Sequence, residues 1–405
     1  MGDVRARFAP SPTGYLHIGG VRTALFNYLY AKRHGGQFLL RIDDTDAARN
    51  VEEALAPILH GFRWLNLLWD EGPEVGGPYA PYYQSQRLAR YQAAAAELLA
   101  KGFAYRDYAT PEELDAERKA AEAAKVPYVY SRKYMAETDA DAARFEAEGR
   151  KGVVRLKMPR EGKLVLADVV RGTVEFEWAR EQDHVVQRAD GTCLYHLANV
   201  VDDYDFQISH VIRAEEHLSN TPRQVFIIQA LGYPLPVYAH VPYVAEPGSR
   251  NKLSKRKIPQ YLKNKDFNQV YEHGLKIAER IGASTALEVF NPVVVDFYET
   301  VGYLPEAIVN YLLLVGWSLD DKTEFISREE MVQHFTLDRV VKASASLDMK
   351  KLWAFQDHYM RLVPLPEKVE KCLPYLVKAK IIADANAPGV KEKLARIVEA
   401  AGDRI

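Results

Sequence analysis

The sequence predicts an α/β protein that begins with a parallel sheet and ends in a mainly helical region. An extended segment at 4–8, apolar residues at helical spacing from Val21 and a compact apolar strand at 38–42 follow one another near the start of the chain. A strand, helix, strand unit implies a parallel pair of strands joined by a right-handed crossover. From Pro305 onward the apolar spacing is mainly helical, and Pro305 itself suits the first turn of a helix.

Composition limits the classes of protein to which the chain can belong. Its 405 residues, 48% of them hydrophobic, are enough for two to four compact units. The formal charge of −2 gives no nucleic-acid signal by itself. Cys193 and Cys372, the only cysteines, lie far apart, so neither a disulfide framework nor a cysteine-based zinc site is indicated. The N-terminus lacks an apolar signal core and no apolar run is long enough to span a membrane, so we expect a cytoplasmic protein without a membrane partner.

Two turns follow the first two predicted strands. The segment 4–8 breaks at Pro10, Pro12 and Gly14, and the strand 38–42 ends in the acidic turn DDTD at 43–46. Ligands of parallel sheets gather beyond the carboxyl ends of the strands. Both turns lie at such ends, and this is the first indication of a site.

The middle of the chain is mixed. Residues 86–101 and 110–125 are rich in Ala, Glu and Leu and are predicted helices, whereas β-like runs occur at 153–157, 164–170 and 173–178. Because site-like segments resume only at Tyr195, we interpret the region before it as an inserted module. A strand at 207–212 then leads into a helix from Glu215 or Thr221, and a strand near 238–244 precedes the loop KLSKR at 252–256.

These observations predict five regions. They are a first sheet half at 1–104, the inserted module at 105–192, a second sheet half with the KLSKR loop at 193–257, a linker or insertion at 258–300 and a helical region at 301–405. The sequence indicates no function for residues 258–296.

His17 stands before Gly19 and Gly20, where a helix is expected to begin. A helix N-terminus offers unpaired N–H groups and positive partial charge, which suits phosphate, and glycine lets a ligand approach the backbone closely. His17 would then hydrogen-bond a phosphate during an in-line displacement. An ordinary turn with a surface histidine explains the same residues, and the local pattern alone favours that simpler interpretation.

Residues 250–265 contain seven basic residues and no acidic one. This run is typical of a solvated basic face or of a patch that contacts a nucleic-acid backbone. Alternatively, Lys255 lies on a triphosphate, where its charge stabilises the departing pyrophosphate. One fixed donor of this kind lowers a barrier by roughly 2.7–4 kcal/mol. The basic run alone does not choose between these interpretations.

Several motifs in order carry a resemblance. RFAPSPTGYLHIGG, FLLRIDDTD, YHLANVVDD, VIRAEEHL and KLSKR follow one another between residues 7 and 256, and no GxxxxGK[ST] or GxGxxG pattern is present. In this order they resemble bacterial-type glutamyl-tRNA synthetases of the class I superfamily. The resemblance implies a Rossmann-like parallel-sheet catalytic domain, an inserted α+β module that binds the tRNA acceptor end, and a helical anticodon-side region that is incomplete here.

The resemblance also implies a glutamate site. Arg7 and Arg213 would clamp the side-chain carboxylate, since planar guanidinium groups suit a carboxylate, and Tyr195 would add a hydroxyl donor. Ser11 and Asn199 would hold the α-carboxylate end. Internal salt bridges, for example from Arg213 to Glu215 or Glu216, remain the simpler alternative for both arginines.

Asp43 is a departure from the family, which normally has glutamate here in contact with the substrate ammonium. The shorter side chain implies a deeper ammonium, a bridging water or weaker binding of the amino acid. The motif around Asn199, Asp202 and Asp203 is alternatively a strand end capped by polar residues, with the two aspartates supporting the fold.

The implied reaction is the ATP-dependent ligation of L-glutamate to the 3′ end of tRNA(Glu) through glutamyl-adenylate, releasing AMP and pyrophosphate. ATP would be bound by Gly19 and Gly20 together with the catalytic side chains His17, Lys252, Lys255 and Arg256. Mg²⁺ is expected with ATP, zinc is not expected, and the protein is expected to be a monomer. Whether tRNA(Gln) is also charged stays open. The alternatives are glutamyl transfer to a modified tRNA base, a non-catalytic tRNA-binding paralogue and a small-molecule adenylyltransferase.

Overall fold

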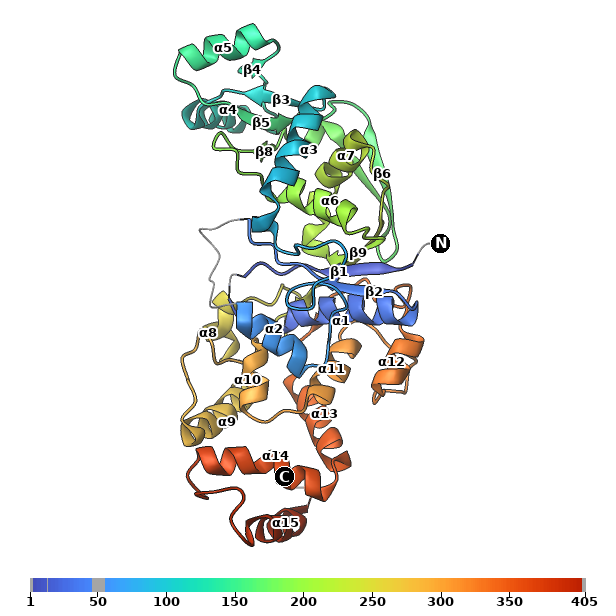
Figure 1. The fold of residues 1–405 in the computed structure, drawn as a ribbon, viewed down its shortest axis with the longest axis vertical. Coiled ribbons are helices and arrows are strands. Elements are labelled where there is room, and N and C mark those ends of the chain that lie inside the picture. Colours follow the sequence, from blue (N-terminus) through green and yellow to red (C-terminus); the bar gives the residue numbers. More distant parts are fainter. Residues whose placement is uncertain (1–2, 13, 46–54, 403–405) are drawn as a thin grey trace. The chain divides into compact units, whose positions relative to one another are not determined.

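The computed structural model describes residues 3–12, 14–45 and 55–402 (Figure 1). Thr13 of the proline-rich turn and Asp46 of the acidic turn therefore lie outside the described residues. The chain divides into two compact units, each built from three segments. The first unit comprises Met1–Ser11, His34–Asn50 and Trp69–Val241, and the second comprises Pro12–Arg33, Val51–Leu68 and Pro242–Ile405.

A six-stranded sheet forms the centre of the first unit. Its strands, in spatial order, are β2 (Gln37–Leu40), β1 (Arg5–Phe8), β9 (His210–Ala214), β10 (Val237–Val241), β6 (Lys163–Asp168) and β7 (Gly172–Glu177). Neighbouring strands are parallel except β6 and β7, which form an antiparallel pair. In the registers, Arg7 stands opposite Leu39 and Arg213 stands opposite His240. Arg7 and Arg213 are therefore fixed on regular strands.

Three helices, α3 (Leu88–Ala100), α6 (Tyr195–Asp205) and α7 (Thr221–Leu231), contact one another beside this sheet (Figure 1). Apolar residues of all three belong to one buried cluster that includes Leu98, Leu197, Ile227 and, from the sheet, Leu39 and Tyr238. This core holds α6 firmly, so the polar residues on α6 have fixed positions.

A second, antiparallel sheet lies in the predicted inserted module. Its order is β4 (Met135–Ala136), β3 (Ala104–Asp107), β5 (Val153–Leu156) and β8 (Val185–Gln187). The helices α4 (Pro111–Ala123) and α5 (Asp139–Ala147) start at capping boxes made by Thr110 and Thr138. The β6–β7 hairpin, also within 105–192, instead extends the six-stranded sheet. The predicted functional division into five regions stays a prediction.

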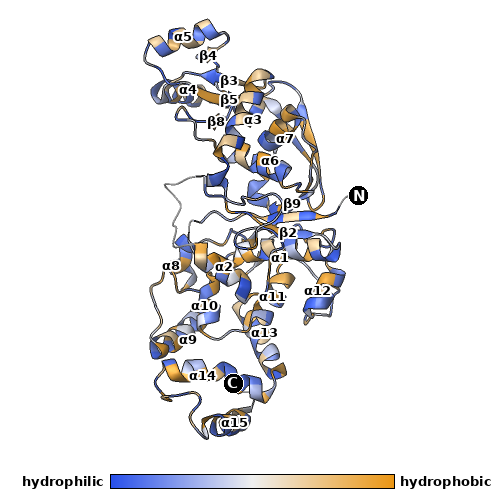
Figure 2. Ribbon diagram, viewed as in Figure 1, coloured by the Kyte–Doolittle hydropathy of each residue, from blue (hydrophilic) through white to orange (hydrophobic). Residues whose placement is uncertain are grey.

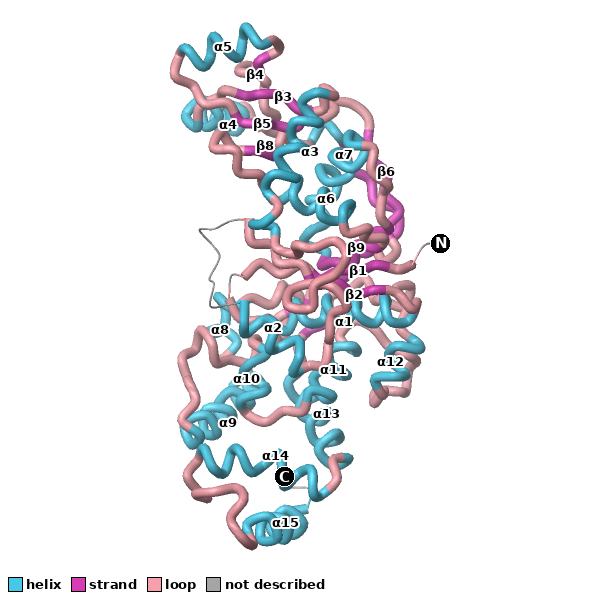
Figure 3. The backbone as a smooth tube through the Cα atoms, viewed as in Figure 1, coloured by secondary structure: helices cyan, strands magenta, loops and turns pink. Residues whose placement is uncertain are grey.

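The second unit is mainly helical, and the strands among its described residues form one short pair (Figure 3). The parallel pair consists of β11 (Val244–Ala245) and β12 (Ala345–Ser346). The helices are α1 (Ile18–Arg33), α2 (Leu55–Trp64), α8 (Ile258–Tyr261), α9 (Lys265–Ile281), α10 (Val295–Thr300), α11 (Pro305–Leu314), α12 (Arg328–His334), α13 (Met349–Leu362), α14 (Leu365–Lys378) and α15 (Val390–Ala401). Most of them carry hydrophobic and hydrophilic residues together (Figure 2), as helices with one buried face do.

The α/β class with a helical C-terminal region is confirmed, but two predicted element bounds and one alternative interpretation were wrong. The first helix begins at Ile18 instead of Val21, and the strand expected at 207–212 is β9 at His210–Ala214. Asn199, Asp202 and Asp203 lie inside helix α6 and do not cap a strand. Residues on nearly all sides of α6 are buried, so the segment that suggested a buried strand end is an enclosed helix. None of the helices in the described part of the chain is long and apolar enough to cross a membrane.

Candidate functional site

In the first unit, two arginines and two aspartates form a buried charge network beside the parallel strands. Arg7 in β1 donates from Nε and Nη2 to the two carboxylate oxygens of Asp203 on α6, both at 3.0 Å. Arg41, which follows β2, donates from Nη1 to Asp203 at 2.8 Å and from Nε to Asp43 at 2.6 Å. Each guanidinium is thus held by a carboxylate, as a buried charge requires. The internal ion pair considered as an alternative for Arg7 is therefore present.

Asp202 lies 3.6 Å from Arg41 Nε at the edge of this network, and most of its contacts connect it to a supporting cluster. Its carboxylate accepts hydrogen bonds from Gln84 at 2.9 Å, from Arg87 at 2.7 Å and from the Tyr91 hydroxyl at 2.8 Å. These partners lie on or near α3, whereas Asp202 lies on α6. The residue ties two helices of the core together, which agrees with the structural role considered for it.

Arg213 has different surroundings. This arginine in β9 is only 6% exposed, yet its three hydrogen-bond partners among the described residues are all neutral. Nε donates to His240 Nε2 at 3.0 Å, Nη1 to Gln224 Oε1 at 2.6 Å and Nη2 to Thr221 Oγ1 at 2.9 Å. The salt bridge to Glu215 considered from the sequence is wrong, because Glu215 pairs with Arg171. No carboxylate among the described residues lies within ion-pair distance of Arg213.

Burial of this uncompensated charge lowers the pKa of the Arg213 guanidinium. An arginine side chain has five N–H donors. Three of the donors of Arg213 have partners among the described residues. The remaining capacity lies on the two terminal nitrogens. An anionic group that can accept two hydrogen bonds matches this arrangement.

The other predicted glutamate-site residues are distributed unequally. Tyr195 begins α6, and burial raises the pKa of its hydroxyl, while the charges of Arg213 and Arg7 lie close enough to oppose that shift. Asn199, one turn further along α6, accepts from Gln224 at 3.1 Å and is thereby linked to Arg213. Ser11 is exposed, so the structure does not bring it into the buried cluster.

Asp43 is buried with both carboxylate oxygens on Arg41, at 2.6 and 3.2 Å. Burial raises the pKa of Asp43 to about 6, and the Arg41 charge offsets part of that shift. A carboxylate with this pKa is ionised at pH 7 and becomes protonated in mildly acidic solution. Asp43 can therefore offer negative charge to an ammonium group, but in a pH-dependent way.

In the second unit, the ring of His17 is held against the first turn of α1. The Gly19 N–H donates to His17 Nδ1 at 2.9 Å. Nδ1 is therefore unprotonated, so the neutral imidazole carries its hydrogen on Nε2. Burial lowers the pKa of His17 to about 3, with the charges of Lys255 and Lys252 adding to the effect. His17 is thus a neutral hydrogen-bond donor through Nε2 over the physiological pH range.

Glycine at position 19 favours this close approach, because a Cβ atom there would lie 3.1 Å from His17 Nδ1 and would push the ring away slightly. The expectation of unpaired N–H groups at the start of α1 was wrong for its first three residues. Ile18 donates to the Val293 carbonyl, Gly19 to the His17 ring and Gly20 to the His17 carbonyl. Because these donors already have partners, an anion here is met by side chains rather than by this helix terminus.

Lys255 is the side chain best placed to provide the positive charge. Its Nζ donates to the Tyr15 carbonyl at 2.8 Å and lies 3.8 Å from the position of a Cβ on Gly14, whose φ is +146°. Burial lowers the pKa of Lys255, and Asp296 opposes the shift. The structure therefore brings His17, Lys252 and Lys255 together, and the simple surface-turn interpretation of His17 is not supported.

The rest of the basic run behaves differently. Arg256 is exposed, and Lys257 forms an ion pair with Glu246 at 3.3 Å. Proximity along the chain therefore does not mean a shared role. Gly20 belongs to the same first turn of α1 as Gly19.

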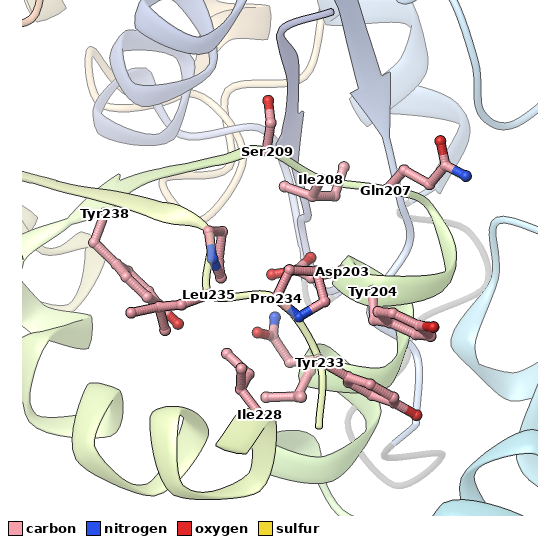
Figure 4. A pocket seen from close by; sticks show the side chains of 13 residues that line it. Asp203, Tyr204, Gln207, Ile208, Ser209, Ile228, Tyr233, Pro234, Leu235 and Tyr238 are labelled. Atoms are coloured by element: carbon pink, nitrogen blue, oxygen red, sulfur yellow. The ribbon is translucent and has the colours of Figure 1, made fainter. Parts of the chain in front are cut away.

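One cavity of the first unit lies beside the buried charge network and shares Asp203 with it. A pocket of about 470 Å³ lies where β9 and β10 begin, and Ser209, Leu235 and the stacked pair Tyr204 and Tyr233 line it (Figure 4). Of the predicted site residues only Asn199 lines it. The pocket is at the amino ends of these strands, whereas ligands of parallel sheets bind at the carboxyl ends.

Sequence reasoning missed the residues that support Arg213. Gln224 and Thr221 lie on α7 and His240 lies on β10, and no motif spacing indicated that they share a cluster with Arg213. A supporting role was considered for Asp203, but its pairing with Arg7 was not indicated. In the described part of the chain, no three His, Cys, Asp or Glu side chains form a potential metal site. The expectation about zinc stays a prediction.

Comparison with known proteins gives a consistent result. The family described as tRNA synthetases class I (E and Q), catalytic domain, matches residues 3–284 and 290–354. The chain is 44% identical over its whole length to a glutamate–tRNA ligase of Moorella thermoacetica and covers 76% of that protein. It is 43% identical to the glutamate–tRNA ligase of Desulforudis audaxviator and covers 74% of it. A crystal structure of a glutamate tRNA ligase from Elizabethkingia meningosepticum, in complex with its amino acid, superposes with a TM-score of 0.83 at 33% identity, covering the whole chain and 77% of that protein.

Proposed function

Because the chain belongs to the class I tRNA synthetases of the glutamate and glutamine type, we propose that it ligates L-glutamate to tRNA(Glu). The reaction has two steps. The α-carboxylate of glutamate attacks the α-phosphate of ATP and pyrophosphate leaves, and a ribose hydroxyl at the tRNA 3′ end then displaces AMP from the glutamyl-adenylate. The relatives named glutamate–tRNA ligase support this reaction over glutamyl transfer to a modified base.

The observation that carries the amino acid specificity is the buried cation Arg213 with neutral partners. The side-chain carboxylate of glutamate would provide the missing negative charge and accept hydrogen bonds from the terminal nitrogens. Glutamine would leave the cation uncompensated, at a cost of about 3–5 kcal/mol when one partner of a buried pair is removed. Arg7 is already paired with Asp203, so its remaining N–H donors and its charge contribute less than Arg213 to binding the substrate carboxylate.

Tyr195, Asn199 and Asp43 complete the amino acid subsite in this proposal. Tyr195 donates its hydroxyl hydrogen, which its raised pKa keeps in place, and Asn199 binds the main-chain end of the substrate. Asp43, ionised at pH 7, attracts the ammonium group from its position on Arg41. Ser11 is exposed, and its role at the α-carboxylate end stays a prediction.

The second unit would bind the phosphates of ATP. His17 donates from Nε2 to a phosphate oxygen, and Lys255 neutralises the charge that develops on pyrophosphate as it leaves. Lys252 adds positive charge, Arg256 is assigned to the same role only by family resemblance, and Gly19 and Gly20 give room for the nucleotide. Mg²⁺ accompanies ATP, and because Lys252 and Lys255 are cationic and His17 is neutral, the phosphates and water would hold it.

The broader assignments are also proposals. The region 105–192 would bind the tRNA acceptor end and 301–405 would lie on the anticodon side. We further propose a cytoplasmic monomer that uses ATP, L-glutamate and tRNA(Glu); tRNA(Gln) is a further candidate whose use depends on anticodon contacts.

Glutamate-dependent exchange of pyrophosphate into ATP, measured with and without tRNA(Glu), tests the proposal. We expect exchange that requires both glutamate and tRNA, followed by formation of glutamyl-tRNA at the 3′ end. Exchange without tRNA would favour a base-modifying transferase or a small-molecule adenylyltransferase. Absence of exchange under both conditions would indicate a binding paralogue.

A further inference from the structure

The orientation of Arg213 depends on a chain of two further buried side chains. His240 lies opposite Arg213 in the β9–β10 register, and its Nε2 is 3.0 Å from Arg213 Nε. On the other side of the ring, His240 Nδ1 is 2.6 Å from Asp168 Oδ2. His240 is 0% exposed and Asp168 4% exposed, so both contacts are shielded from water.

These contacts define the protonation state of His240. Arginine has only donors, so His240 Nε2 must present its lone pair to Arg213 Nε. The imidazole hydrogen is then on Nδ1 and is donated to the Asp168 carboxylate. Burial lowers the pKa of His240, which agrees with a neutral ring. Asp168 is itself fixed, because its Oδ1 accepts from the backbone N–H groups of Val170 at 3.0 Å and Arg171 at 2.8 Å.

We propose that Asp168 and His240 are positioning residues that hold the Arg213 guanidinium in the orientation in which it binds the substrate's side-chain carboxylate. This inference rests on the proposed function and adds residues to that same site. Asp168 selects the tautomer of His240, and His240 accepts from Nε of Arg213. Thr221 and Gln224 accept one hydrogen from each terminal nitrogen, so rotation of the guanidinium plane is restricted by three contacts.

The arrangement also explains why Arg213 remains unneutralised. A carboxylate placed directly on Nε would satisfy the charge and compete with the substrate. A neutral imidazole supplies the same acceptor without the negative charge, and the negative charge of Asp168 lies one ring further away. The guanidinium is therefore oriented but still requires an anion, which favours glutamate over glutamine.

Asp168→Asn is the variant that separates orientation from folding. The amide oxygen can keep the contacts of Oδ1 with the backbone N–H groups of Val170, Arg171 and His240. The amide nitrogen then replaces Oδ2, which accepts from the His240 ring and shares the His240 backbone N–H. That nitrogen is a donor, so His240 must accept at Nδ1 and carry its hydrogen on Nε2, where it faces the Arg213 N–H. We expect the KM for glutamate to rise about 10- to 100-fold, the range for one lost hydrogen bond to a charged group. The KM for ATP and kcat should change much less, since the second unit is unaltered.

His240→Gln is the conservative partner variant. Its side-chain oxygen can accept from Arg213 Nε regardless of the residue at 168, so adding Asp168→Asn to it should raise the glutamate KM little further. The matched control is Asp107→Asn. Asp107 is also a buried aspartate, bonded to Tyr130 and Arg155, and its replacement should leave the glutamate KM near wild type. ¹⁵N NMR of histidine-labelled protein should show His240 with its hydrogen on Nδ1 in the wild type and on Nε2 in Asp168→Asn.

The inference would be overturned if Asp168→Asn changed the His240 tautomer but left the glutamate KM unchanged. It would also be overturned if Asp168→Asn raised the glutamate KM as much in the His240→Gln variant as in the wild type. If Asp168→Asn does not fold, Thr221→Val, which removes the acceptor on Nη2, must raise the glutamate KM for the inference to stand. The proposed function fails separately, namely when wild-type exchange does not depend on glutamate. A glutamate-dependent wild type with unaffected variants would refute the positioning role alone.

Discussion

Replacement of Lys255 by methionine is the sharpest test of the phosphate subsite. Methionine keeps most of the length of the side chain and removes its charge. In the structure, Lys255 Nζ donates to one carbonyl, that of Tyr15 at 2.8 Å, and the described residues place no carboxylate within ion-pair distance of it. The charge is therefore not cancelled locally, so a phosphate would experience most of it.

The expected magnitude follows from two estimates. A unit charge about 4 Å from another contributes about 4 kcal/mol at an effective dielectric constant of about 20. A fixed transition-state donor contributes roughly 2.7–4 kcal/mol, or about 10²- to 10³-fold in rate. We therefore expect Lys255→Met to slow glutamate- and tRNA-dependent ATP–pyrophosphate exchange at least about 100-fold at saturating substrates. His17 should stay neutral, because burial is the larger cause of its lowered pKa.

Lys257→Met is the matched control in the same basic run. Lys257 pairs with Glu246 at 3.3 Å and does not contact the Tyr15 carbonyl that Lys255 binds. Its loss should change the exchange rate no more than about threefold, as for an exposed ion pair. Equal losses in the two variants would mean that the run acts as a general basic face, and a near-normal rate in Lys255→Met would remove Lys255 from the mechanism.

Three other substitutions test the first unit. Arg213→Lys replaces a planar donor group by a point charge, and we expect the KM for glutamate to rise at least about tenfold with little change in the KM for ATP; equal effects on both substrates would contradict a glutamate-specific role. Asp43 has a pKa raised to about 6, so the KM for glutamate should rise as the pH falls below that value, by up to about tenfold per unit, while Asp43→Asn should show a high KM without this dependence. The raised pKa of Asp43 also makes folding pH-dependent, but in the opposite direction. The stability that protonated Asp43 contributes to the fold is lost as the pH rises from 3.8 to about 6. Asp202→Asn removes the charge that Arg87 and Arg41 face and should lower the free energy of unfolding in urea by about 3–5 kcal/mol; a loss below about 1 kcal/mol would show that this cluster does not stabilise the fold.

The elements of the fold follow from local patterns in the sequence. Alternating and periodic apolar residues mark most strands and helices, and proline and glycine mark their ends, so β1, α3 and α11 lie close to where the pattern indicates. The segment around Asn199 is the informative exception. Apolar and polar residues alike are buried here because α6 is enclosed, and periodicity cannot distinguish an enclosed helix from a buried strand.

The sequence by itself determined the family, through ordered motifs, and with it the residues proposed to bind substrate, among them His17, Lys255 and Arg213. Only the tertiary structure decided which charges are already neutralised. Arg7 and Arg213 look alike in the sequence, but Asp203 holds the first and neutral groups hold the second. Such pairing arises between elements far apart along the chain, where burial makes each unpaired charge costly, and no local pattern records which partner a folded core will supply.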